Sequence, residues 1–313
     1  MKISIDALTE ILNLQEEKQP LIHCISSMVT MNDLAQGILS YNGNPIMALG
    51  IDEIGEITTR AEAVLIDLGT LDNNKIAAME KSLRIASRKN KPVVLDAVGV
   101  DISLFRKEIA LIFLARYKID VIKGNLLEIK ELLEKRTKKG KEHKGRKEDK
   151  ERNENEEIVE NKEIEEIIKV GEFGERVIDS IKNDYEVREK MREFSKRYKT
   201  ILIATGNENY VTDGFSEFFI SNGNERFNKI VGVNSILAGL ISVGVAVART
   251  TAEKVQAVLI AIMTMGISQD IVYEKNKENF GLMSLKNYLI DEISIINTTK
   301  IEAMGKISYV FKR

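Results

Sequence analysis

The chain has 313 residues, and 43% of them are hydrophobic, which is enough to bury a large core in one domain or in two smaller ones. Its 46 basic and 48 acidic side chains give a formal charge of -2, so no global field favours nucleic acid, an anionic membrane or an acidic partner. Any ligand must therefore be held by local groups.

The cysteine content and the apolar runs indicate a cytoplasmic protein. A single cysteine, Cys24, excludes a disulfide within the chain and a cysteine-rich zinc site, and it is typical of a reducing compartment. The first 18 residues alternate charged with apolar side chains, so we expect no signal peptide. The longest apolar run, residues 236–248, contains two glycines and a serine and is shorter than the ~20 residues that a bilayer requires. We therefore predict a helix buried inside protein.

Short apolar runs recur along the chain and predict strands that are buried on both faces. These runs cover residues 21–25, 63–68, 93–95, 121–122 and 201–204. Amphipathic segments of helical period lie between them. This alternation predicts an α/β fold with a mostly parallel central sheet and helices on both faces.

The second half of the chain is predicted to be more helical. Residues 210–213 and 218–220 flank Gly214 and predict a hairpin, whereas residues 234–247 and 252–272 predict two long core helices. We expect all of these elements to belong to one domain that spans residues 1–313.

A charged segment, residues 134–169, interrupts this pattern. Up to Glu166 its only apolar residues are Ile158, Val159 and Ile164. Such a composition cannot bury enough surface to offset the entropy of ordering the segment. We interpret it as a flexible insertion within the domain, and a charged docking arm is the alternative.

The residues at the carboxyl ends of the predicted strands are rich in ligand-binding groups. They are Asp96, Lys123, Gly124, Asn125, Thr205 and Gly206, with Glu128 three positions beyond Asn125. Ligands of parallel α/β sheets sit at these strand ends, where two carboxylates in one crevice can hold Mg²⁺. We therefore predict a magnesium-nucleotide site with Asp96 and Glu128 as its metal ligands. Asn125 and Glu128 also suit the first turn of a helix, as a cap and a favourable charge, and that alternative stays open.

A second motif, Gly232-Val233-Asn234-Ser235, opens the predicted helix at residues 234–247. A glycine turn at a helix start aims unpaired N–H groups and the helix dipole at an incoming anion. The motif therefore suits a transferring phosphoryl group, although a glycine before a helix is also common for structural reasons alone.

The order of these motifs resembles the hydroxyethylthiazole kinase family. The resemblance covers about residues 5–133 and 195–290. It rests on Pro20-Leu-Ile-His23-Cys-Ile-Ser-Ser27, Pro45-Ile-Met47-Ala48, Asp67-Leu-Gly69-Thr70-Leu71, Pro92-Val-Val-Leu-Asp96-Ala-Val-Gly99, Lys123-Gly124-Asn125-x-x-Glu128, Thr205-Gly206, Tyr210-Val-Thr-Asp213-Gly214 and Gly232 to Ser235. A histidine near a strand end, such as His23, is more often packed and hydrogen-bonded than catalytic.

The resemblance implies a three-layer ribokinase-like fold and, in most members, a trimer whose thiazole pockets lie between subunits. It implies ATP- and Mg²⁺-dependent phosphorylation of the primary alcohol of 4-methyl-5-(2-hydroxyethyl)thiazole in thiamine salvage. It also assigns roles: Met47, Ser27 and Gly232 to the substrate; Lys123, Asn125, Thr205 and Gly206 to the nucleotide; Asp96 and Glu128 to the metal; and Gly232, Asn234 and Ser235 to catalysis.

Two departures from the family pattern leave alternatives open. The family usually has Gly-Thr-Gly-Cys at 232–235, and a serine hydroxyl has no accessible anion at neutral pH, whereas a thiol titrates near ~8.5. Lys123 stands where an arginine is common in the family. A guanidinium that can donate two parallel hydrogen bonds to a phosphate is thus replaced by an ammonium, which acts as a point charge. The alternatives are a catalytically weakened homologue that binds thiazole or nucleotide, a kinase of another small heterocyclic alcohol, and an ATP-dependent dehydratase of the same fold.

Overall fold

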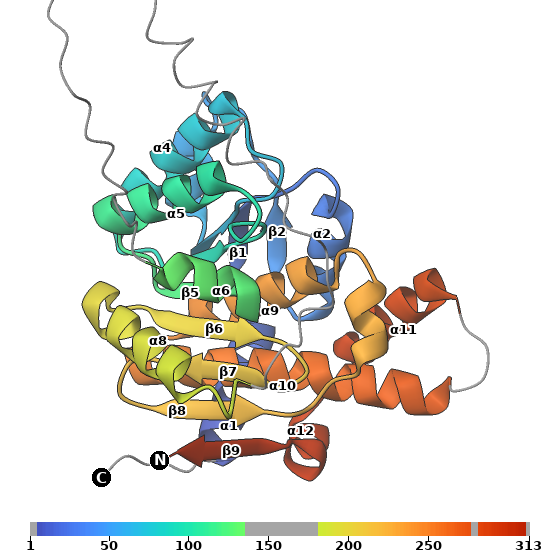
Figure 1. Cartoon of the computed structure of the whole chain (residues 1–313). Coiled ribbons are helices and arrows are strands. Elements are labelled where there is room, and N and C mark those ends of the chain that lie inside the picture. The colour runs from blue at the N-terminus through green and yellow to red at the C-terminus, as the bar shows by residue number, and fades with distance from the viewer. Residues whose placement is uncertain (1–4, 135–180, 277–280, 311–313) are drawn as a thin grey trace, which may run out of the picture. The chain divides into compact units, whose positions relative to one another are not determined.

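Nine strands of the described residues form one sheet, in the order β2-β1-β3-β4-β5-β6-β7-β8-β9 (Figure 1). The computed structural model describes residues 5–134, 181–276 and 281–310. Neighbouring strands are parallel from β2 to β6 and antiparallel from β6 to β9. The strands are β1 (Leu21–Ile25), β2 (Asn44–Ile46), β3 (Ala63–Asp67), β4 (Val93–Asp96), β5 (Val121–Asn125), β6 (Ile201–Thr205), β7 (Asn209–Thr212), β8 (Glu217–Ile220) and β9 (Ile307–Val310).

Helices cover both faces of this sheet, so the predicted three-layer α/β arrangement is confirmed. One core contains residues of α4, α5, α6 and α8, and the other contains residues of α2, α9, α10 and α11. The helices are α1 (Ile5–Lys18), α2 (Met31–Ser40), α3 (Ile54–Arg60), α4 (Asn73–Lys89), α5 (Leu104–Arg116), α6 (Leu126–Leu133), α8 (Tyr185–Tyr198), α9 (Val233–Val247), α10 (Thr251–Lys275), α11 (Leu282–Ser294) and α12 (Thr298–Met304), with a 3₁₀ helix η1 (Glu225–Lys229).

Period-two alternation along the strands divides the apolar side chains between the two cores. In β3, Val64 and Ile66 pack into the core beneath α4, and Leu65 packs into the core beneath α9. A strand buried on both faces is mostly apolar, which is why continuous apolar runs predicted the positions of these strands along the chain.

Strands β4, β5 and β6 reach further toward their carboxyl ends than the apolar runs predicted. Asp96, Lys123 and Asn125 lie inside β4 and β5 instead of following them, which corrects the prediction. The cause is that the backbone ladder continues: Asp96 pairs with Lys123 across β4 and β5, and Asn125 pairs with Thr205 across β5 and β6. Polar side chains are thus held in register at one edge of the sheet.

Two helices, α9 and α10, form the apolar layer behind the sheet (Figure 1). Within the part of the chain that the structure describes, α10 alone is long and apolar enough to cross a membrane, and 83% of its most apolar 18-residue window is buried inside the protein. That burial is typical of a core helix. The prediction of buried helices at residues 234–247 and 252–272 is therefore confirmed.

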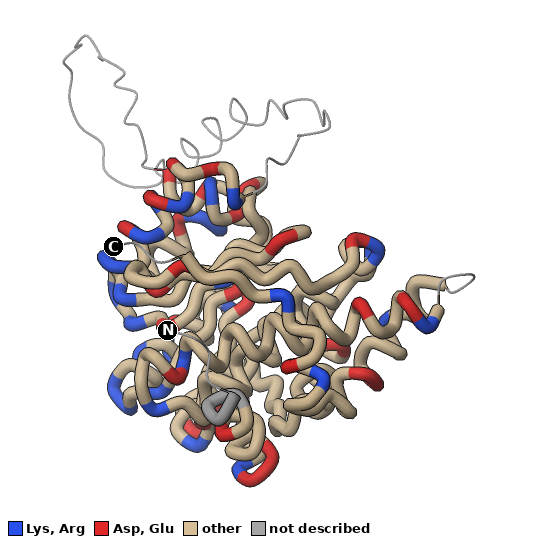
Figure 2. The backbone as a smooth tube through the Cα atoms, turned by 90° about the horizontal axis from the view of Figure 1, so that it is seen from below, with Lys and Arg blue, Asp and Glu red and all other residues tan. Residues whose placement is uncertain are grey.

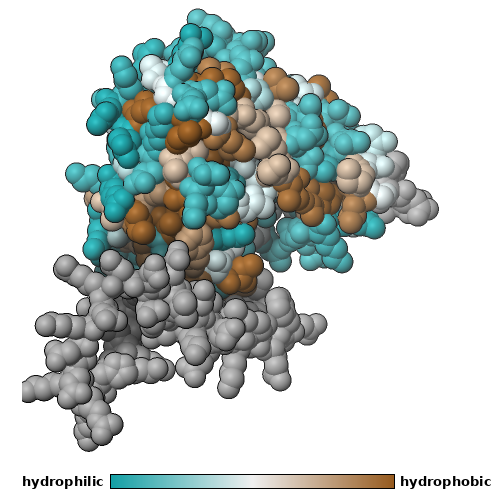
Figure 3. Space-filling model, turned by 90° about the horizontal axis from the view of Figure 1, so that it is seen from above, coloured by the Kyte–Doolittle hydropathy of each residue, from teal (hydrophilic) through white to brown (hydrophobic). Residues whose placement is uncertain are grey.

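Charge is distributed evenly over the described backbone. Figure 2 shows basic and acidic residues interspersed, without a large region of one sign. Figure 3 shows apolar side chains reaching the surface between hydrophilic ones on the face seen from above. Apart from Glu134, the predicted insertion at residues 134–169 lies outside the described residues.

The close contact between α10 and the loop after β8 gives a stability prediction. A Cβ on Gly266 would lie 2.5 Å from the backbone oxygen of Asn222. We expect Gly266→Ala to lower the free energy of unfolding by up to about 2 kcal/mol, because the cost of overpacking, ~1–3 kcal/mol, is offset only in part by the ~1 kcal/mol gained in helix propensity. Urea unfolding followed by circular dichroism measures the change.

Gly55→Ala is the matched control. A Cβ on Gly55, in α3, meets its nearest atom, on the flexible Lys81 side chain, at 3.9 Å. Helix propensity should then raise the stability slightly. Equal stabilisation by both substitutions would contradict the packing described for Gly266.

Candidate active site

A buried ion pair between Asp96 and Lys123 lies at the carboxyl end of the sheet. The Lys123 ammonium donates to both carboxylate oxygens of Asp96 at 2.9 Å, and the side chains are 1% and 2% exposed. Burial raises the pKa of Asp96 to about 7, and the Lys123 charge opposes that rise. The ammonium has three donors, so one more acceptor can bind there.

Glu128 lies beside this pair but in the first turn of α6, so the prediction that it occupies a strand end is wrong. Its carboxylate accepts hydrogen bonds from Asn125 N at 2.6 Å and from Gly99 N at 2.8 Å. The Asn125 side chain caps the same turn, so the helix-capping alternative is confirmed. Burial also raises the pKa of Glu128. The same carboxylate thus caps α6 through Asn125 and contacts the loop after Asp96 through Gly99.

Thr205 and Gly206 extend this edge to solvent. Thr205 is buried, and its hydroxyl donates to Gly124 O at 3.3 Å, whereas Gly206 is exposed and its N–H donates to the Asn209 side chain at 3.4 Å. Both donors are therefore engaged within the protein, by long hydrogen bonds.

Asp67 organises the adjacent loops, although the sequence analysis assigned it no role beyond its place in a motif. Its carboxylate accepts from Ser26 Oγ at 3.0 Å, Ser27 N at 3.1 Å and Gly69 N at 2.7 Å. It lies opposite Asp96 in the β3–β4 register. Its position at the end of a predicted strand could have identified Asp67 as a candidate site residue.

The Gly232 motif starts α9 as predicted. Gly232 has φ +99°, which favours glycine, and its carbonyl accepts the Ile236 N–H at 2.9 Å. The Asn234 side chain is exposed at the helix start. The Ser235 hydroxyl donates to Thr30 Oγ1 at 2.9 Å, and none of its described partners is a base. No side chain caps this helix start. Val233 N donates to Ile230 O at 3.5 Å, whereas no described contact engages the N–H groups of Asn234 and Ser235, so these two can bind an anion.

Backbone contacts connect the two halves of the site. Thr30 N donates to Ser27 O at 3.2 Å, and Ser27 N donates to Asp67. The contacts therefore run from Ser235 through Thr30, Ser27 and Asp67 to the strand ends. Of the predicted residues, Ser235 and Ser27 belong to this series of contacts, and Asp67 pairs with Asp96 in the β3–β4 ladder.

His23 lies on β1 and Met47 lies just after β2, at the end of the sheet formed by these two strands. Met47 follows β2, is half-buried and packs against the core. The buried His23 ring bonds Ala48 O through Nε2 and Thr58 Oγ1 through Nδ1, both at 3.0 Å. Burial lowers the pKa of His23, so the neutral ring is favoured. His23 is thus packed and hydrogen-bonded, as expected of such a histidine.

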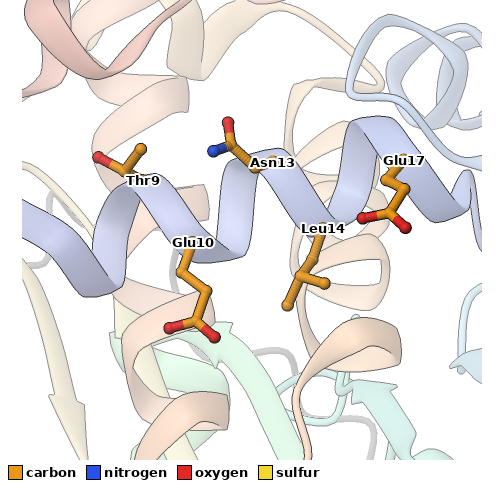
Figure 4. Close-up of a pocket in the computed structure, with 5 residues that line it drawn as sticks. All are labelled: Thr9, Glu10, Asn13, Leu14 and Glu17. Carbon is orange, nitrogen blue, oxygen red and sulfur yellow. The ribbon is translucent and has the colours of Figure 1, made fainter.

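The described residues contain no preformed metal cage, and the surface hollow along α1 lies away from this site. In the described ranges, no group of three or more His, Cys, Asp and Glu side chains is placed to hold a metal ion. The hollow has a volume of about 380 Å³ and is open (Figure 4). Helix α1 leads into the amino end of β1, away from the carboxyl ends. The residues that line the hollow all come from α1: Thr9, Glu10, Asn13, Leu14 and Glu17.

The sheet and its two helical layers have a ribokinase-like fold. A solved ribokinase-like superfamily protein from Enterococcus faecalis has a TM-score of 0.52 at 12% identity, over 93% of this chain and 94% of that chain, which shows the fold. The solved hydroxyethylthiazole kinase of Pyrococcus horikoshii has a TM-score of 0.75 at 28% identity, over 97% of this chain and 99% of that chain.

The sequence comparisons identify the family. A profile of the hydroxyethylthiazole kinase family matches residues 12–161 and 158–299. The hydroxyethylthiazole kinase of Clostridium perfringens is 30% identical over 94% of this chain and 98% of that relative, and the P. horikoshii enzyme is 31% identical over 99% of both chains. The chain belongs to the hydroxyethylthiazole kinase family.

The raised pKa of Asp96 predicts a measurable titration. Because the folded pKa lies above the ordinary value near 3.9, the folded protein holds this proton longer than the unfolded chain does. The contribution of Asp96 to the free energy of unfolding should therefore fall as the pH rises from about 4 toward 7. NMR of labelled aspartate carboxyl carbons, assigned by the signal that Asp96→Asn removes, should give a midpoint well above 3.9. A midpoint at the ordinary value would contradict the burial described here.

Proposed function

We propose that this protein transfers the γ-phosphoryl group of ATP to the primary alcohol of 4-methyl-5-(2-hydroxyethyl)thiazole, a step of thiamine salvage. The observation that supports the proposal best is the buried Asp96–Lys123 pair, with Glu128 bonded to the loop after Asp96. The α9 start is linked to Asp67, the ladder partner of Asp96, through Ser235, Thr30 and Ser27. Phosphoryl transfer depends mainly on positioning and charge neutralisation, which these groups supply.

We assign the metal to Asp96 and Glu128. Their hard carboxylate oxygens suit Mg²⁺, and each carboxylate makes only two hydrogen bonds in the described contacts, which leaves lone pairs for a metal or its water. The ion would neutralise charge on the ATP phosphates. Lys123 would give its third donor to a phosphate oxygen, and Asn125, Thr205 and Gly206 would contact the nucleotide beside it.

We assign the transferring group to the α9 start. The N–H groups after Gly232, including that of Asn234, would bind it. Ser235 would position the reactants instead of removing a proton, because its hydroxyl already donates to the neutral Thr30. General-base catalysis contributes about 10²- to 10⁴-fold, so the enzyme is expected to be slower than relatives with cysteine at this position.

The acceptor alcohol would bind between Met47, Ser27 and Gly232, and we propose a homotrimer that closes this pocket. Two apolar side chains next to Ser27 support this proposal: Met28 is 78% exposed and Val29 is 70% exposed. Val231, next to Gly232, is also exposed. A second subunit would cover these side chains. We also propose that the enzyme is cytoplasmic, and the buried Cys24, which forms no disulfide, supports this location. We propose that residues 134–169 are an insertion within a single domain, because the two family matches meet at residues 158–161.

The direct test is an assay of purified protein with MgATP and the thiazole alcohol. We expect equimolar ADP and thiazole phosphate, detected by mass spectrometry. Asp96→Asn should lower kcat at least 10²-fold, because it removes a metal ligand. The absence of thiazole phosphate at high enzyme concentration would contradict the proposed function.

Ser235→Cys separates the alternatives. In a correctly built kinase that lacks only an efficient base, this variant should raise kcat by ten-fold or more. Tight thiazole binding without turnover in either form would instead favour the binding homologue. Turnover of a different heterocyclic alcohol at a higher kcat/KM would reassign the substrate.

A further inference from the structure

The carboxylate of Asp33 lies against the glycine that starts α9. Asp33 is in the first turn of α2. A Cβ on Gly232 would lie 2.9 Å from both Cβ and Cγ of Asp33 and would collide with its Oδ2. The absence of a side chain at Gly232 therefore lets a negatively charged group pack directly beside the helix start.

This placement poses an electrostatic problem. The α9 start attracts anions through its N–H groups and dipole, but a carboxylate beside it repels the same anions. In a partly buried site, water screens that repulsion poorly. An uncompensated Asp33 would therefore weaken the binding of a phosphoryl group.

Lys286 compensates this charge from a distant part of the chain. Its ammonium donates to Asp33 Oδ2 at 2.8 Å, although 253 positions separate the two residues. The side chains are 10% and 14% exposed, so the pair is largely withdrawn from water. Lys286 belongs to α11, which packs on α2 and on η1, just before Gly232.

We propose that Lys286 is a positioning residue for phosphoryl transfer: it neutralises Asp33 and so keeps the Gly232 helix start attractive to the transferring group. This role rests on the proposed function, which places the phosphoryl group at Gly232. A purely structural ion pair is the alternative, since Asp33 also suits the first turn of α2.

Charge rescue distinguishes the two roles. We expect Lys286→Met to lower kcat about ten- to hundred-fold, with little change in KM for the thiazole alcohol. This fall is smaller than the ~10²- to 10³-fold fall in kcat that follows removal of a group donating directly to the reacting atoms. Asp33→Asn keeps the shape beside Gly232 and removes the charge, so the double variant should recover kcat to within about three-fold of the wild type. Lys254→Met is the control, because it breaks a similarly buried pair with Asp120 at the opposite edge of the sheet.

The affinity for inorganic phosphate, measured by calorimetry, provides a readout that does not need turnover. It should fall in Lys286→Met, recover in the double variant and remain unchanged in Lys254→Met. Unchanged kcat and phosphate affinity in Lys286→Met would overturn the proposal, as would a double variant as impaired as the single one. If the wild type makes no thiazole phosphate, the proposed function fails, and the phosphate measurements alone decide whether Lys286 compensates Asp33.

Discussion

The ion pair between Asp96 and Lys123 is the interaction on which the site depends. Both groups are almost fully buried, and removing one partner of such a pair typically costs 3–5 kcal/mol because the other charge stays unpaired. The pair also continues the β4–β5 ladder into polar residues, which holds two charged side chains in register at the carboxyl edge. A site for a polyanion and a metal needs both signs of charge at fixed positions, and this pair supplies them.

The rest of the site is held by contacts that extend outward from this edge. Glu128 fixes the loop after Asp96, and Asp67 fixes the loop that carries Ser27. Through Thr30, that loop reaches Ser235 and the anion-binding start of α9. The residues that we propose for the acceptor, the nucleotide and the phosphoryl group would then be held by contacts between loops from separate strands, as a reaction governed by positioning requires.

The sequence predicted the layers of the fold because strands buried on both faces are mostly apolar. It placed the carboxyl ends of β4 and β5 too early, since Asp96 and Lys123 become compatible with a buried strand only when they pair with each other. The motif at Gly232 was recognised because it is local. Asp33 and Lys286 were missed because 253 positions separate them, and no local pattern indicates that α11 returns to the start of α2.

The central claim is that the Asp96–Lys123 pair binds metal-bound nucleotide phosphates. Calorimetric titration of MgADP into the double variant Asp96→Asn, Lys123→Met tests it directly, because neither charge is left buried and unpaired. Lys118→Met, which alters a lysine paired with Asp120 at the opposite edge, is the control. We predict at least ten-fold weaker binding in the double variant and unchanged binding in the control. Wild-type affinity in the double variant would contradict the account.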